Sequence, residues 1–152
     1  MHIIDRKFLE NPRPFFIQSA LASLIIFLTL LIMGFISPVI VAALGATTFI
    51  VFAMPEASTA GIRSIFGGHM IGLVSGLAFA WSPHAVVGAS LAVGVSILLM
   101  VVMDAEHPPA AGTALGVALL GYSAPSVVFI IGAAGMLALI HRGLRRWMVD
   151  LV

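Results

Sequence analysis

Apolar residues run along this chain in six segments, separated by short breaks rich in proline, glycine or charged residues. The segments cover residues 15–35, 38–54, 65–81, 85–103, 110–121 and 127–140. A helix needs about 20 apolar residues to cross a bilayer, at about 1.5 Å per residue. The first and fourth segments are long enough, whereas the fifth would reach only about 18 Å. The pattern predicts an all-α polytopic bundle of transmembrane helices with four to six membrane segments, including short or broken (re-entrant) ones.

Prolines indicate where the short helices start. Pro109 fits the first turn of a helix, where its missing N–H costs nothing, and Pro55 stands in a similar place before the third apolar segment. Next to Pro55, Glu56 and Ser58 offer side-chain oxygens that suit a helix N-cap. We therefore expect two short helices, beginning at Pro55 and Pro109.

The composition places the chain in the membrane. Of its 152 residues, 61% are hydrophobic and only 9% are charged, and the mean hydropathy is +1.19. A soluble domain of this size could not keep so much apolar surface away from water. A net charge of +1 without a basic stripe argues against nucleic acid as a partner. The lack of cysteine excludes disulfides and thiolate chemistry. The apolar composition makes the lipid bilayer the expected partner.

The positions of the cations predict a topology. Arginine and lysine occur at 6–13 before the first segment, at Arg63, and at 142–146 after the last. By the positive-inside rule both termini face the cytoplasm, so the number of crossings is even and is either four or six. We predict a cytoplasmic N-terminal segment 1–14, a transmembrane domain 15–141 and a cytoplasmic C-terminal segment 142–152. The expected location is the plasma (inner) membrane of a bacterium.

The most concentrated ionisable chemistry is in residues 104–109, Asp-Ala-Glu-His-Pro-Pro, between two apolar segments. Ionisable groups near membrane depth are costly and usually functional. A helix starting at Pro109 would point its first free N–H groups back toward His107, and such a helix N-terminus attracts anions. The alternative is that 104–109 and 55–64 are ordinary cytoplasmic loops with solvated carboxylates.

These features predict a site for a small anion. We expect helix N-termini at 55–61 and 107–113 to supply backbone donors, while hydroxyls and imidazoles supply side-chain donors and histidine carries a proton. The candidate substrate-binding residues are Thr47, Thr48, Pro55, Ser58, Thr59, His69, His107, Pro108, Pro109, Ala110, Ala111, Gly112 and Thr113.

A different chemistry stays open, since His69, Glu56, Glu106 and His107 could together bind a metal or cofactor. However, the chain has no His-x-x-x-His or Glu-x-x-His pair, no phosphate loop, no dinucleotide fingerprint and no nucleophile elbow. We therefore predict no enzymatic activity, no cofactor and no bound metal. The alternative function is a non-transporting module that uses these four residues, and a structural or sensory subunit of another membrane protein is a third possibility.

Glycines spaced four residues apart indicate helix faces that pack closely. Small residues let helices approach where lipid supplies no hydrophobic driving force. The candidate packing residues are Gly68, Gly72, Gly76 and Gly116. Such faces also make a homo-oligomer the expected assembly. We interpret His84 and His141 as interfacial side chains without a role in a site.

Three sequence blocks, in order, carry a resemblance to a known family. They are Gly-Ala-Thr-Thr-Phe-Ile-Val-Phe-Ala-Met-Pro at 45–55, Gly-Gly-His at 67–69 and His-Pro-Pro-Ala-Ala-Gly-Thr-Ala at 107–114. With these blocks the chain resembles the HPP family of small integral membrane proteins, which is named after its His-Pro-Pro motif. The resemblance covers residues 15–140.

The resemblance implies a compact transmembrane bundle, usually described as four-spanning, and nitrite transport in some plastid and cyanobacterial members. The positions that match its motifs are Gly45, Ala46, Pro55, Gly67, Gly68, His69, His107, Pro108, Pro109, Gly112 and Thr113. The chain departs from the family at 57–61, where a Ser-Pro-Leu-Ala-Gln-Pro-like stretch is common, and at Glu106, where a small or neutral residue is common. The leading prediction is a membrane transporter or channel for a small inorganic anion, nitrite-like.

Overall fold

Helices make up most of the computed structural model, which describes residues 4–34 and 37–152 and contains no strand in these ranges. The α-helices are α1 (Arg6–Glu10), α2 (Arg13–Met33), α3 (Pro38–Ala53), α4 (Gly68–Phe79), α5 (Ala85–Val102), α6 (Pro108–Leu120) and α7 (Ala124–Leu144). The 3-10 turn η1 (Ser58–Ala60) and the π-helix η2 (Arg63–Gly67) lie between α3 and α4, and the 3-10 turn η3 (Arg145–Trp147) follows α7. The predicted all-α membrane bundle is confirmed.

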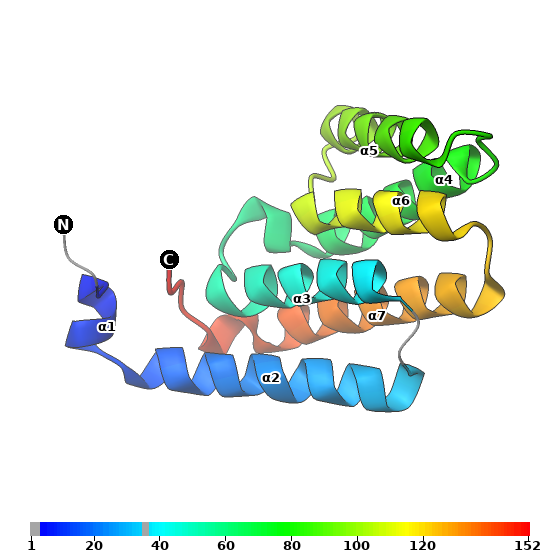
Figure 1. The fold of residues 1–152 in the computed structure, drawn as a ribbon. Helices are drawn as coiled ribbons and strands as arrows, with labels where there is room; N and C mark the ends of the chain where they lie inside the picture. The colour runs from blue at the N-terminus through cyan, green and yellow to red at the C-terminus, as the bar shows by residue number, and fades with distance from the viewer. Residues whose placement is uncertain (1–3, 35–36) are drawn as a thin grey trace.

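The helices α2 to α7 run alternately in opposite directions, so both termini lie at the same end of the bundle, here called the terminal end (Figure 1). α2, α5 and the stretch Ala124–Trp147 are long and apolar enough to span a membrane, whereas α3 and α6 are shorter apolar helices. α6 has 13 residues, or about 20 Å. In Figure 1 it runs parallel to α2, away from the terminal end, without turning back.

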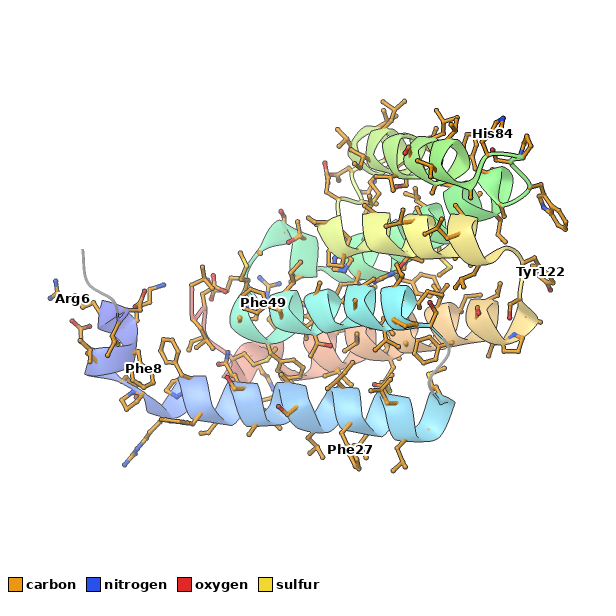
Figure 2. All side chains as sticks on the ribbon, viewed as in Figure 1. Arg6, Phe8, Phe27, Phe49, His84 and Tyr122 are labelled. Atoms are coloured by element: carbon orange, nitrogen blue, oxygen red, sulfur yellow. The ribbon has the colours of Figure 1, made fainter. Side chains whose placement is uncertain are left out.

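α6 is the centre of the packing, because it contacts α3, α4 and α5. Glycines allow this closeness: a Cβ added at Gly76 of α4 would lie 2.6 Å from the Cβ of Val117, and one at Gly116 of α6 would lie 3.1 Å from Cγ1 of Ile40 on α3. Large apolar side chains on the outer helices point away from the bundle, as Phe27 of α2 does in Figure 2. The outside is therefore suited to lipid and the inside to tight helix contact.

The helix expected to begin at Pro55 is absent, so that prediction is wrong. Pro55 lies in a turn, the backbone is extended at Ala57 and again at Gly61, and the helix that leads into α4 starts only at Arg63. Other parts of the chain occupy the backbone groups of this stretch: the Glu56 N–H donates to the Asp150 carboxylate. At Pro109 the prediction differs by one residue, since α6 begins at Pro108 with His107 as its N-cap.

The α5–α6 connection is built around Asp104. This residue has a φ of +52°, a left-handed conformation that Asp tolerates better than most residues. The Asp104 N–H donates to the Val101 carbonyl, and the Ala105 N–H donates to the Met100 carbonyl at 2.9 Å. This is the Schellman arrangement that ends a helix. The Asp104 carboxylate also pairs with Arg63 at 3.0 Å on the surface.

The C-terminal residues 148–152, here called the C-terminal strap, fold back across the terminal end. The buried amide of Gln18 on α2 accepts from the Val149 N–H at 2.9 Å and donates to the carbonyls of Val149 and Phe52. The Leu151 N–H donates to the carbonyl of Ala53 at 2.9 Å. The strap therefore ties α2 to the end of α3.

Candidate functional site

Four polar side chains meet in the interior, where α3, α4 and α6 come together. They are Thr47 on α3, His69 on α4, His107 at the N-cap of α6 and Thr113 one and a half turns into α6. The exposed fraction of each is 1% or less. We call this set the His–Thr cluster. Buried polar groups in membrane segments are costly, which makes them the first candidates for function.

The cluster forms one continuous chain of hydrogen bonds. Oγ1 of Thr113 lies 2.8 Å from Nδ1 of His69, and Nε2 of His69 lies 2.9 Å from Oγ1 of Thr47. The same Thr47 oxygen lies 2.9 Å from Nε2 of His107, and Nδ1 of His107 lies 2.8 Å from the carbonyl oxygen of Thr59. All four imidazole nitrogens of His69 and His107 have a partner, so the two rings are held in fixed orientations.

The Thr59 carbonyl determines the direction of the chain, because a carbonyl oxygen only accepts. His107 must therefore donate through Nδ1–H. In its neutral form its Nε2 then accepts, and the Thr47 hydroxyl supplies that proton. Thr47 in turn accepts from Nε2–H of His69, whose Nδ1 accepts from the Thr113 hydroxyl. A single set of neutral tautomers satisfies the whole chain.

The local structure explains how the two histidines come so close. The π-helix η2 runs directly into α4, and Gly68, the first residue of α4, lies against the Cβ of His107 and the carbonyl of Ala105. π-helical turns are frequent at functional sites. The ring centroids of His69 and His107 are only 5.1 Å apart.

A pocket of about 300 Å³ opens between α5 and α6 beside the cluster. Met100, Glu106, His107 and Ala111 are among its lining residues, so the pocket borders one residue of the cluster, His107. The other carboxylate of residues 104–109, that of Asp104, is outside the lining of this pocket and forms an ion pair with Arg63. The two acids therefore occupy different surroundings, and Glu106 is the one that borders the site.

Several predicted site residues lie apart from the cluster or have other partners. The Thr48 hydroxyl donates to the Leu44 carbonyl, and Ser58 is exposed. The Ala110 N–H, expected to be free, donates to the His107 carbonyl at 2.8 Å, so that expectation is wrong. Gly112 faces Ala43 of α3. Thr59 takes part through its carbonyl rather than its hydroxyl, and the first N–H groups of α6 do not form an open anion site.

Of the four residues proposed for a metal, only His69 and His107 are shown to lie close together. Within residues 4–34 and 37–152, no group of three or more His, Cys, Asp or Glu side chains is placed to hold a metal ion. Glu56 is exposed and its N–H contacts the C-terminal strap, whereas His69 and His107 bond to threonines and a carbonyl. The geometry offers a metal only two imidazoles, both already engaged.

Two buried polar residues were missed at the sequence level. His141 is not interfacial: it is 3% exposed, and its Nε2–H donates to the Pro55 carbonyl at 2.8 Å. Gln18, also buried, holds the C-terminal strap. Gln18 was detectable as an amide within a long apolar segment, but nothing in the sequence indicated its partners.

The motif histidines thus share one buried hydroxyl inside an apolar bundle. The family described as HPP, transmembrane region, matches residues 9–144. The chain belongs to the HPP family. It is an integral membrane protein, since both the family and the long apolar helices require a bilayer. Comparison with curated proteins and with solved structures gave no match. In this HPP protein, the His-Pro-Pro and Gly-Gly-His motifs contribute one ring each to the His–Thr cluster.

Proposed function

We propose that this HPP protein is a membrane transporter or channel for a small inorganic anion, nitrite-like, and has no enzymatic activity. The observation that carries the proposal is the His–Thr cluster: two imidazoles and two hydroxyls buried at the contact of three helices. Polar groups kept at such a place in a membrane protein are usually functional. The α5–α6 pocket beside His107 offers a small ion an approach from the side of α5.

The chemistry of the cluster favours an anion over a cation. Its side chains are hydroxyls and imidazoles, all able to donate hydrogen bonds, and none of the four is a carboxylate. A cation site of a membrane protein normally has oxygen ligands with negative charge. We assign the donors to the side chains at 47, 69, 107 and 113, which in this structure bond to one another and to the Thr59 carbonyl, and not to a helix N-terminus at Pro55.

Transport can be measured with the purified protein in proteoliposomes. We expect uptake of nitrite, and we would compare it with nitrate, formate and chloride. His107→Ala and His69→Ala should abolish the uptake, whereas Thr29→Val should leave it unchanged, because Thr29 is a buried threonine of α2 that bonds only within its own helix. Absence of flux for all four anions, or flux that survives both histidine substitutions, would contradict the proposal.

We place both termini in the cytoplasm at a bacterial inner membrane. The arginine and lysine residues support this orientation, since Lys7, Arg63 and 142–146 lie in segments at the terminal end. The chain has no cysteine, so a single cysteine introduced at Arg145 or at Tyr122 reports which side of the membrane that position faces. We expect Arg145→Cys to react from the cytoplasm and Tyr122→Cys to react from the outside. If a reagent that cannot cross the membrane labels Arg145→Cys in intact cells, the C-terminus faces outward and the proposed orientation is wrong.

The last part of the proposal is that this protein forms a homo-oligomer. Gly68, Gly72 and Gly76 pack against α6, and Gly116 packs against α3, so these glycines serve contacts within one chain. A homo-oligomer would therefore use other surfaces. The mass of the protein in lipid nanodiscs or by native mass spectrometry tests this part, and a monomer under all conditions would exclude it.

A further inference from the structure

The Thr47 hydroxyl has three partners but only one proton to donate. Its Oγ1 lies 2.9 Å from Nε2 of His69, 2.9 Å from Nε2 of His107 and 3.0 Å from the carbonyl oxygen of Ala43. A threonine hydroxyl donates once and accepts up to twice. Thr47 can therefore donate to either ring or to the Ala43 carbonyl, and it can accept only from a ring N–H, because the carbonyl has no proton to give.

With both rings neutral, Thr47 donates to Nε2 of His107 and accepts from Nε2–H of His69, and the Ala43 carbonyl is left with its helix partner alone. If one proton is added at Nε2 of His107, both rings donate to Thr47. The Thr47 hydroxyl then rotates and donates to the Ala43 carbonyl. All the hydrogen bonds are satisfied again, and no heavy atom has moved.

The added proton can also be held on the other ring. If it arrives at Nδ1 of His69, that nitrogen donates to Oγ1 of Thr113, which reverses its hydroxyl, while Thr47 continues to donate to His107. The cluster thus accommodates one excess proton at two positions, and Thr113 and the Thr59 carbonyl stabilise the two ends.

We propose that Thr47, His69 and His107 form a proton relay that holds one excess proton and passes it between the two rings through the Thr47 hydroxyl. In the transfer, the Nε2–H bond of His69 breaks as an O–H bond forms on Thr47. The former O–H bond of Thr47 breaks as an N–H bond forms at Nε2 of His107. One proton leaves His69, one arrives at His107, and Thr47 ends as a neutral hydroxyl that donates to His69.

This relay deepens the proposed function, on which its transport part rests: the anion is carried together with a proton. No fixed cation faces the cluster among the described residues. The helices α3, α5 and α6 contain no Asp, Glu, Lys, Arg or His, and α4 contains only His69. A protonated ring is then the cluster's own source of positive charge for an anion.

The charged and titratable groups around the His–Thr cluster lie on the side of the cluster that faces the terminal end of the bundle. Glu106 lines the α5–α6 pocket with His107, and Arg63 and Asp104 form an exposed ion pair. On the other adjoining elements, Glu56 is exposed and His141 of α7 bonds to the Pro55 carbonyl. The pocket beside Glu106 is therefore the side from which a proton reaches or leaves the His107 ring.

Nitrogen NMR of the full chain, labelled at histidine nitrogens in lipid bilayers, tests the relay without any transport assay. At high pH we expect His107 as the Nδ1–H tautomer. As the pH falls, protonation of one ring should change the signals of both rings in a single step. Thr47→Val should uncouple the rings, Thr47→Ser should keep them coupled, and Thr29→Val should resemble the unsubstituted protein. Rings that titrate independently, or coupling that persists in Thr47→Val, would overturn the relay.

Proteoliposomes with an internal pH indicator test the coupling to transport. We expect a proton to enter with each anion, and Thr47→Val to slow proton entry on the order of 100-fold or more, with Thr47→Ser close to the unsubstituted rate. Anion flux without proton entry would refute proton coupling and leave the anion transporter standing. Coupled rings in the NMR experiment without any anion flux would refute the transporter and leave the relay standing.

Discussion

Gly68 of α4 and His107 of α6 are in such close contact that a Cβ at position 68 would lie 2.6 Å from the Cβ of His107. The Ala105 carbonyl would be 3.2 Å away and the Cβ of Ala110 3.4 Å away. These neighbours are backbone or near-backbone atoms, so they cannot rotate out of the way. The spacing of the two histidines in the cluster therefore depends on the missing side chain of Gly68.

Gly68→Ala should push α4 away from α6 and break the contacts of His69 and His107 with Thr47. We expect a loss of about 1–3 kcal/mol in the free energy of unfolding, as for other overpacked cores. Thermal unfolding in detergent measures this loss. The control is Gly94→Ala on α5, where a new Cβ meets nothing within 4 Å and should add about 1 kcal/mol of helix stability. Equal stability of the two variants would contradict the contact.

Glu106→Gln should distinguish an anion from a cation as the transported species. Glu106 lines the pocket beside His107, so its negative charge disfavours an approaching anion. Its removal should raise anion flux about two- to fivefold, in line with the modest strength of partly solvated charges. The control is Asp104→Asn, since Asp104 is exposed and paired with Arg63. A fall in flux with Glu106→Gln would indicate that the carboxylate assists the substrate, and the anion assignment would be wrong.

Position 104 should prefer glycine to alanine, although both remove the carboxylate. The residue has a φ of +52°, which costs a residue with a Cβ about 1–2 kcal/mol but costs glycine little. Asp104→Gly should therefore be more stable than Asp104→Ala by about 1 kcal/mol in the same unfolding measurement. The lost ion pair contributes equally to both variants. Equal stabilities would mean that the α5–α6 connection does not retain this conformation.

Gln18→Leu should release the C-terminal strap. The substitution leaves the Val149 N–H and the carbonyls of Phe52 and Val149 without their partner, at a cost of about 1–3 kcal/mol. Residues 148–152 should then be removed by carboxypeptidase faster than in the unsubstituted protein, as followed by mass spectrometry. Thr29→Val on the same helix should show the original rate. A strap that stays protected in Gln18→Leu would show that other contacts hold it.

The helices were predictable because their signal is local. Long apolar segments require helices in a bilayer, where each backbone group must find its partner within the segment. The proline at the start of α6 acts in the same local way. The failure at Pro55 has a tertiary cause: Glu56 and Thr59 bond to Asp150 and His107, which are far away along the chain. This stretch closes only the 3-10 turn η1 and does not form an α-helix.

The sequence by itself determined the all-α membrane class and the short α6, and it included Thr47, His69, His107 and Thr113 among the candidate residues. Only the tertiary structure decided which candidates meet. It joined the two histidines through the Thr47 hydroxyl and Thr113 to the far side of the His69 ring. It also separated these four from Thr48 and Ser58, and gave His141 and Gln18 structural partners. The reason is physical: residues 22, 44 and 60 positions apart bond only where α3, α4 and α6 approach closely. That approach depends on glycine contacts between helices, which apolar periodicity does not encode.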